Sequence, residues 1–171
     1  RPGGVHHRGS FEYLRRVCDM NGFMKNHYRI GLDVPGLILF FMIMAPNLIW
    51  FVHPAPVDVL RQPSATPHLD QIASIVQAVF VAALCLLKSD RAGRLPAALW
   101  GGIAVCTVGY FAAWGCFFGG LVHPALLIAM CVLPCLSLLL YAAGRRNWVA
   151  GAFGLVFGVL HTAYGICNFM P

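Results

Sequence analysis

Polar side chains that interrupt long apolar runs are the residues of this sequence whose chemistry is most informative. Asn47, Asp70, Gln77, Tyr110 and His161 each lie within such a run or at its end. Polar groups are expensive inside a bilayer, so residues of this kind are default candidates for a functional site. Their amide, carboxylate, phenol and imidazole groups donate or accept hydrogen bonds and can relay a proton. We therefore treat these five residues as a candidate polar pocket.

His161 has two interpretations. It shares one helical stripe with Gly158 and Gly165, so it should point into a helix bundle and away from lipid. In the functional interpretation it is a proton-relay, ligand-binding or metal-binding residue that faces an outward vestibule. In the structural interpretation its neutral imidazole is hydrogen-bonded to a tyrosine, an asparagine or a backbone carbonyl. We favour the structural interpretation at this point.

Metal, cofactor and catalytic sites have little support in the sequence. His53, His123 and His161 lie far apart and lack the local spacing of metal ligands. Cys131 and Cys135 share a helix face, but two thiols do not make a metal site, and we interpret the cysteines of the apolar runs as packing residues. No GxSxG, HExxH or Walker A motif occurs. We expect no catalytic residues, no metal and no cofactor.

The composition indicates the environment in which these residues act. Of 171 residues, 59% are hydrophobic and only 11% are charged, and the mean hydropathy is +0.73. Soluble domains are about a quarter charged, and a soluble chain this short could not bury so much apolar surface. The net charge of +6 does not indicate nucleic-acid binding, because the basic residues form short clusters between apolar runs. That pattern is typical of membrane topology signals.

The apolar runs predict an all-α integral membrane bundle of five transmembrane helices. A crossing needs about 20 apolar residues. The Gly119–Pro124 segment divides a stretch that is too long for one crossing. Pro46 should kink the first helix, and Thr66 and Pro67 predict the start of the second, with Asp70 in its first turn. The predicted helices run from about Val34 to His53, His68 to Leu87, Pro96 to Phe118, Val122 to Ala142, and Trp148 to Asn168.

Basic residues predict the orientation of the bundle. With the N-terminus in the cytoplasm, only Arg61 falls outside, and the remaining basic residues of the loops fall inside. This asymmetry predicts an N-in/C-out topology in a cell membrane. The inner basic residues are Lys25, Arg29, Lys88, Arg91, Arg94, Arg145 and Arg146. We expect residues 1–23 to be a non-native or disordered leader before a natural start at Met24, and residues 24–171 to form a single transmembrane domain.

Small residues mark the faces on which the helices should pack. Glycines, cysteines and an alanine recur at alternating spacings of three and four along the third predicted helix, which places them on one face. Glycines, His161 and Asn168 likewise share one face of the fifth. Small residues four apart let helix backbones approach closely. The predicted helix-packing residues are Gly102, Gly109, Gly115, Gly119, Gly154 and Gly158. We expect packing within one chain, with a homodimer interface as the alternative.

The segment Gly31–Leu87 contains three short motifs: PN-x-x-W at Pro46–Trp50, the PAP-x-D-x-L loop that follows, and TP-x-x-D at Thr66–Asp70. Through these motifs the segment resembles a family of small bacterial multi-pass membrane proteins of unassigned function. The resemblance covers about two of the five predicted crossings. It implies the cytoplasmic membrane of a bacterium but no activity and no catalytic residues.

Three functions remain open, in this order. The first is a non-enzymatic accessory or interaction subunit, which the missing motifs, short loops and small-residue faces favour. The second is a small-solute or proton-coupled transporter with an outward-facing polar pocket. The third is an intramembrane metal or haem enzyme. The expected partners are the lipid bilayer and either a membrane-protein partner or further copies of the chain, but no nucleic acid.

Overall fold

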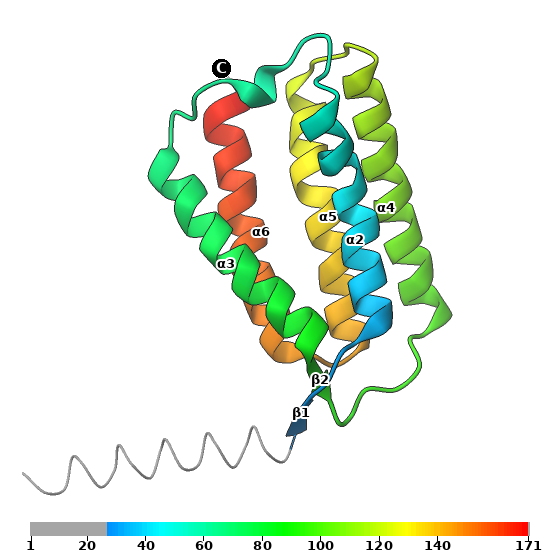
Figure 1. The fold of residues 1–171 in the computed structure, drawn as a ribbon. Helices are drawn as coiled ribbons and strands as arrows, with labels where there is room; N and C mark the ends of the chain where they lie inside the picture. Colours follow the sequence, from blue (N-terminus) through cyan, green and yellow to red (C-terminus); the bar gives the residue numbers. More distant parts are fainter. Residues whose placement is uncertain (1–26, 171) are drawn as a thin grey trace, which may run out of the picture.

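The computed structural model describes residues 27–170 and is an all-helical bundle with one short β-ladder (Figure 1). The leader predicted for residues 1–23 lies outside the described residues. Five of the helices are long and apolar enough to cross a membrane. They are α2 (Val34–Val52), α3 (Pro67–Leu86), α4 (Ala97–Phe118), α5 (Pro124–Gly144) and α6 (Trp148–Phe169). The all-helical class and these five apolar helices are confirmed.

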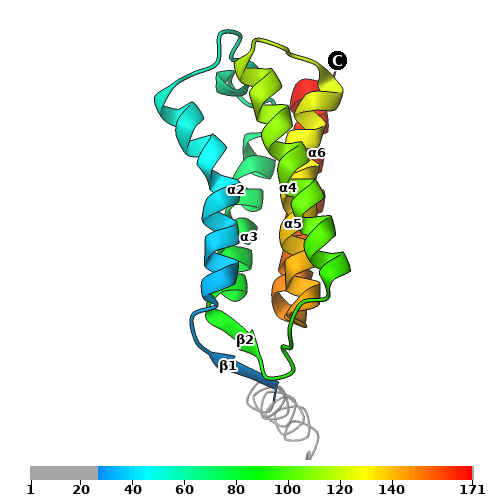
Figure 2. The same cartoon turned by 90° about the vertical axis from the view of Figure 1, so that its right-hand side faces the viewer.

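Local chemistry explains where these helices begin. Pro35, Pro67 and Pro124 each lie in the first turn of a helix, where the missing backbone N–H costs little. Gly120 has a φ of 86°, a conformation that glycine adopts without strain, and it separates α4 from α5. Asp70 lies in the first turn of α3, as predicted. Pro46 lies inside α2, and Figure 2 shows this helix bending in its C-terminal half.

A β-ladder that the sequence analysis did not predict joins the start of α2 to the end of α3. Strand β1 (Tyr28–Ile30) pairs antiparallel with β2 (Leu87–Ser89). Two further backbone bonds continue the pairing into the helix ends, from Gly31 N to Leu86 O at 2.9 Å and from Asp33 N to Cys85 O at 2.7 Å. The two helices are therefore fixed together at this end, which we call the hairpin end.

Four helices form a packed row and the fifth lies against it more loosely. α3 packs on α6, α6 on α5, and α5 on α4, whereas α2 makes far fewer contacts with α3, α4 and α5. Figure 1 shows α2 and α3 close together at the hairpin end and apart at the opposite end. Large apolar side chains also cover the outside of the bundle; for example, Val105 is 73% exposed. Such a surface, on five helices of this length, suggests a multi-pass membrane protein.

Polar side chains close the hairpin end of the bundle. The carboxylate of Asp33 caps α2, accepts a hydrogen bond from Tyr141 Oη at 2.8 Å and pairs with Arg145 Nε at 3.0 Å. Asn147 caps α6 through Ala150 N and donates from Nδ2 to Ala83 O and Leu87 O at the end of α3. These side chains thus connect α2 to α5 and α3 to α6 at the hairpin end.

The opposite end is spanned by the loop between α2 and α3, which contains the 3₁₀ turn η1 (Val59–Arg61). At its first anchor, Asp58 accepts from Trp50 Nε1 and pairs with Arg61. At its second anchor, Asn168 of α6 accepts from Ala65 N at 2.7 Å and donates to the Thr66 hydroxyl at 2.9 Å. The loop is therefore attached to α2 through Trp50 and to α6 through Asn168, at the end where α2 and α3 are furthest apart.

Glycines bring some of the helices into close contact, but not all of those predicted. A Cβ on Gly154 would lie 2.7 Å from a ring carbon of Phe80, so only glycine allows α3 and α6 this close. Gly102, Gly109 and Gly158 also face side chains of α5. Gly115 and Gly119 do not support the prediction: a Cβ on Gly115 would meet nothing within 4 Å, and one on Gly119 would meet only its own helix backbone. Their spacing matches a packing motif, but that face of α4 is not covered by another helix.

Candidate functional site

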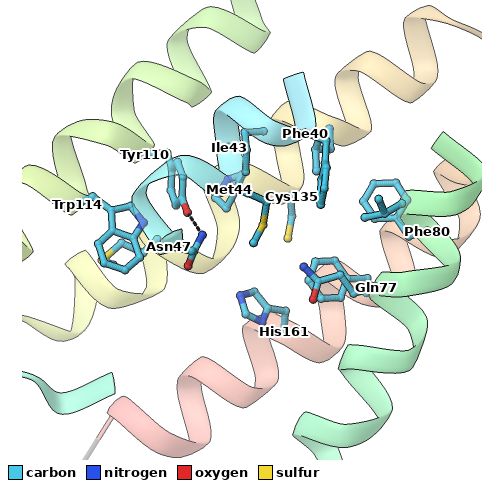
Figure 3. Close-up of a pocket in the computed structure, with 15 residues that line it drawn as sticks. Phe40, Ile43, Met44, Asn47, Gln77, Phe80, Tyr110, Trp114, Cys135 and His161 are labelled. Carbon is cyan, nitrogen blue, oxygen red and sulfur yellow. Dashed lines mark hydrogen bonds between the residues drawn. The ribbon is translucent and has the colours of Figure 1, made fainter. Parts of the chain in front are cut away.

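A cavity of about 250 Å³ lies inside the bundle and is lined by side chains from all five helices (Figure 3). Four of the five predicted pocket residues line it: Asn47 from α2, Gln77 from α3, Tyr110 from α4 and His161 from α6. The rest of its wall is apolar or aromatic, with Phe40, Phe80 and Phe157 among the lining residues. The structure thus brings together polar groups that are up to 114 residues apart in the sequence (Asn47 to His161).

Asp70, the fifth predicted residue, does not line the cavity. It is exposed in the first turn of α3. Gln77 follows seven residues later, about 10 Å further along the helix at a rise of about 1.5 Å per residue. Asp70 therefore lies near the mouth of the bundle, where an acidic residue is favourable beside the positive end of the helix dipole.

Asn47 and Tyr110 form the one direct hydrogen bond between the predicted pocket residues of the described chain. Asn47 Nδ2 donates to Tyr110 Oη at 2.8 Å, so the bond connects the loosely packed α2 with α4. The phenol is deeply buried, with 2% of Tyr110 exposed. The bond leaves the Asn47 carbonyl oxygen and the phenol proton free to contact another group.

Gln77 and His161 have unused hydrogen-bonding groups. Within residues 27–170, neither side chain forms a hydrogen bond, so the bond expected for a structural His161 is not found there. The imidazole instead stacks on Phe157, with ring centroids 5.1 Å apart, and lies parallel to Tyr164 at 6.4 Å. Figure 3 shows the Gln77 amide and the His161 ring beside the same open space that Asn47 faces.

Trp114 is a fifth polar contributor to the cavity that the sequence analysis missed. Its side chain lines the cavity, only 4% of the residue is exposed, and its indole Nε1 has no hydrogen-bond acceptor among the described residues. Buried polar groups are nearly always paired, so this N–H could donate to a group bound in the cavity. Its place one turn after Tyr110, on the same face of α4, is the signal that could have identified it.

The polar groups around this cavity are amide, phenol, indole and imidazole groups, together with the thiol of Cys135. None of the lining residues is an aspartate, glutamate, lysine or arginine. Among residues 27–170 there is also no group of three histidines, cysteines or acidic residues that could hold a metal ion. His123, one of the three histidines considered earlier, instead caps α5, where its Nδ1 accepts from Ala125 N at 3.2 Å. The cavity offers amide, phenol, indole and imidazole groups within an apolar wall.

Comparison with known proteins gives no relative for this chain. No family model, no curated protein and no solved structure matches it. The resemblance of Gly31–Leu87 to small bacterial membrane proteins stays a prediction. Functional assignment therefore depends on the geometry of the cavity.

Proposed function

We propose that the chain is a multi-pass protein of the cytoplasmic membrane, oriented N-in/C-out, that binds a small uncharged solute inside its bundle. The exposed apolar side chains on all five helices support insertion into a bilayer. The orientation is supported by the basic residues, which gather at the hairpin end, whereas Arg61 is the single lysine or arginine of the described residues at the opposite end.

The observation that carries the proposal is the convergence of polar residues on one cavity. Asn47, Gln77, Tyr110 and His161 come from four different helices and line the same space. Polar residues that served only to connect helix pairs would be satisfied in separate pairs, as Thr107 and Ser137 are at 2.9 Å. Gln77 and His161 instead leave their donors and acceptors directed toward a shared volume. Desolvating unused polar groups is costly, and a bound solute would offset that cost.

The lining chemistry supports one class of solute. A charged ligand is disfavoured, because no permanently charged side chain lines the cavity. The volume of about 250 Å³ is below the range of about 300 to 1,000 Å³ that is typical of sites for drug-sized ligands. A small amphipathic molecule fits best: an apolar body against Phe80 and Phe157, an acceptor for Trp114 Nε1, and a second polar group between Gln77 and His161.

The loose packing of α2 supports the proposal that the protein transports the solute that it binds. α2 supplies Asn47 and Phe40 to the cavity wall, yet it has the fewest contacts of the five helices. A helix that moves relative to a packed row can change access to a central site, as alternating access requires. The Asn47–Tyr110 bond would then be a contact that forms and breaks as access changes.

Thermal unfolding of the detergent-purified protein tests solute binding. The protein would be screened with small alcohols, amides, phenols and indoles, because binding to the native state adds about 2.7 kcal/mol at a hundred times Kd. The variants Trp114→Phe and His161→Leu should lose the response to a solute that stabilises the wild type. Thr107→Val is the matched control, since it removes a buried hydrogen bond away from the cavity and should lower stability while keeping the response. If no solute raises the Tm of the wild type, the accessory-subunit alternative replaces this proposal.

Cysteine labelling tests the orientation independently. Cys167 is exposed in the last turns of α6, at the end opposite the hairpin. Cys116 is also exposed near this end, so the test uses a Cys116→Ser background. A membrane-impermeant maleimide added to intact cells should label Cys167 in that background, and adding Cys167→Ser should remove the labelling. Labelling of Cys167 only after cell lysis would contradict the N-in/C-out orientation.

A further inference from the structure

The hairpin end of the bundle carries an excess of positive charge that the described acidic residues do not neutralise. Among residues 27–170, this end has six basic and two acidic residues. Both acidic residues are already paired, Asp33 with Arg145 at 3.0 Å and Asp90 with Arg29 at 3.5 Å. The basic residues without an acidic partner in the described part of the chain are Lys88, Arg91, Arg94 and Arg146.

Three of these four arginine and lysine side chains surround one pocket. Arg91, Arg94 and Arg146 line a depression of about 450 Å³ between the β2–α4 loop, the start of α4 and the end of α5. Gly93, one of the lining residues, accepts a hydrogen bond from Arg145 Nη1 at 3.2 Å, which connects the β2–α4 loop to the end of α5. The arginines are thus arranged around a defined cavity and are not scattered over the end of the molecule.

The start of α4 adds the positive end of a helix dipole at the same place. Pro96, which lines the pocket, is the N-cap of α4 and provides no side-chain acceptor for the first amides of the helix. The positive end of the helix dipole favours an anion beside it. The pocket therefore combines guanidinium groups with the positive end of a helix.

Arg146 occupies its position at a conformational cost. Its φ of 52° is left-handed, and it is the single non-glycine residue with a positive φ in the described chain. It follows α5 in a turn closed by bonds from Arg146 N to Ala143 O and from Asn147 N to Ala142 O, both at 2.9 Å. Glycine is the residue usually found in such a helix-terminating turn. An arginine in a strained backbone position beside a basic pocket indicates that its side chain is needed there.

We propose that this pocket binds the phosphate group of an anionic molecule at the cytoplasmic surface of the membrane. Arginine matches phosphate oxygens with paired hydrogen bonds, and basic pockets between transmembrane helices bind anionic lipid head groups. Leu99 lines the pocket and Trp100 beside it is 46% exposed, so an apolar surface for acyl chains adjoins the phosphate site. The inference depends on the proposed membrane insertion and orientation but not on the solute cavity, which lies deeper in the bundle.

Thermal unfolding of the full chain in a non-ionic detergent tests the inference with defined probes. Phosphatidylglycerol and phosphatidate supply a lipid phosphate, phosphatidylcholine supplies a zwitterionic head group, and inorganic phosphate supplies the free anion. The diagnostic variants are Arg94→Gln and Arg146→Gly. The second should fold at least as well as the wild type without lipid, because glycine adopts the left-handed turn without strain. Lys88→Gln is the matched control, since it removes a charge from the same end but outside the pocket.

We expect phosphatidylglycerol and phosphatidate to raise the Tm of the wild type and of Lys88→Gln, and phosphatidylcholine to have no such effect. Each diagnostic variant should need about tenfold more anionic lipid for the same rise, because it loses charge-assisted hydrogen bonds. A similar response to millimolar inorganic phosphate, lost in Arg146→Gly, would support the phosphate site with free phosphate as its source. Equal lipid responses of wild type, Arg94→Gln and Arg146→Gly would overturn the proposal. So would an equal loss in Lys88→Gln, which would mean that only the total charge of this end matters.

Discussion

Replacing Asp33 by alanine should destabilise the bundle by removing the carboxylate on which the hairpin end is anchored. Asp33 is 4% exposed, and its carboxylate accepts from Tyr141 Oη at 2.8 Å and pairs with Arg145 Nε at 3.0 Å. It also caps α2 through Gly36 N at a longer distance of 3.4 Å. The substitution would leave a buried phenol and a mostly buried guanidinium without their acceptor.

The magnitude follows from the burial of the two partners. Removing one member of a buried ion pair costs about 3 to 5 kcal/mol, since the other charge stays buried and unpaired. The side chain of Arg145 is 25% exposed, so water partly compensates, and we expect the lower part of this range. The loss of the long cap bond adds only a small amount. Asp33→Ala should therefore lower the free energy of unfolding by about 3 kcal/mol.

Reversible unfolding of the protein in mixed micelles with increasing SDS measures this change. Asp90→Ala is the matched control, because Asp90 and Arg29 form an ion pair at the same end with side chains 44% and 72% exposed. That exposed pair should contribute less than about 1 kcal/mol. A loss below 1 kcal/mol for Asp33→Ala, or equal losses for the two variants, would refute the argument that burial makes the Asp33 cluster the anchor of this end.

Two further predictions concern other contacts. Gly154→Ala would place a Cβ 2.7 Å from a ring carbon of Phe80, so it should lower the free energy of unfolding by about 1 to 3 kcal/mol. Gly151→Ala is the control, because its Cβ would meet no atom within 4 Å and should not lower stability in the same assay. Equal effects of the two variants would contradict the packing argument. Asn168→Leu removes the second anchor of the α2–α3 loop. Trypsin should then cleave this variant after Arg61 faster than it cleaves the wild type, while the Tm stays nearly unchanged. An unchanged cleavage rate would show that the anchor does not order the loop.

The helix ends were predictable because local chemistry marks them. All ten predicted ends lie within two residues of the observed ones. Proline fits the first helical turn and disfavours the interior, so Pro35, Pro67 and Pro124 mark starts independently of tertiary structure. The length of a bilayer crossing then determines roughly where each helix ends.

The hairpin end was not predictable, because its order comes from contacts between distant residues. Strands β1 and β2 have three residues each, too short for a recognisable alternation of side chains. Asp33 precedes Val34 and Pro35 as an ordinary helix cap, and nothing nearby indicates that its partners are Tyr141 and Arg145. Such clusters depend on how helices are placed in space, which sequence periodicity does not specify.

The candidate site was predictable only in part, because periodicity describes one helix at a time. Periodicity shows which residues share a face of one helix, and it placed His161 on the face that packs inward. The rotation of the helices about their axes decides which inward residues meet, so the grouping of Asn47, Gln77, Tyr110 and His161 was only a hypothesis. Trp114 was missed because an indole in an apolar run is common, and its unpaired Nε1 is visible only in three dimensions.

The long separation between Asp33 and its partners sets the order in which the bundle can be completed during synthesis. Tyr141 follows Asp33 by 108 residues, which takes roughly 5 to 20 s at typical translation rates. During this interval α2, the earliest of the five helices, can be fixed by the ladder to β2 and by the Asn47–Tyr110 bond, but not by the cluster around Asp33. The cavity needs walls from all five helices and so exists only after α6 has been made. A cell must therefore keep α2 in place, with an unpaired carboxylate at its start, until the later helices arrive.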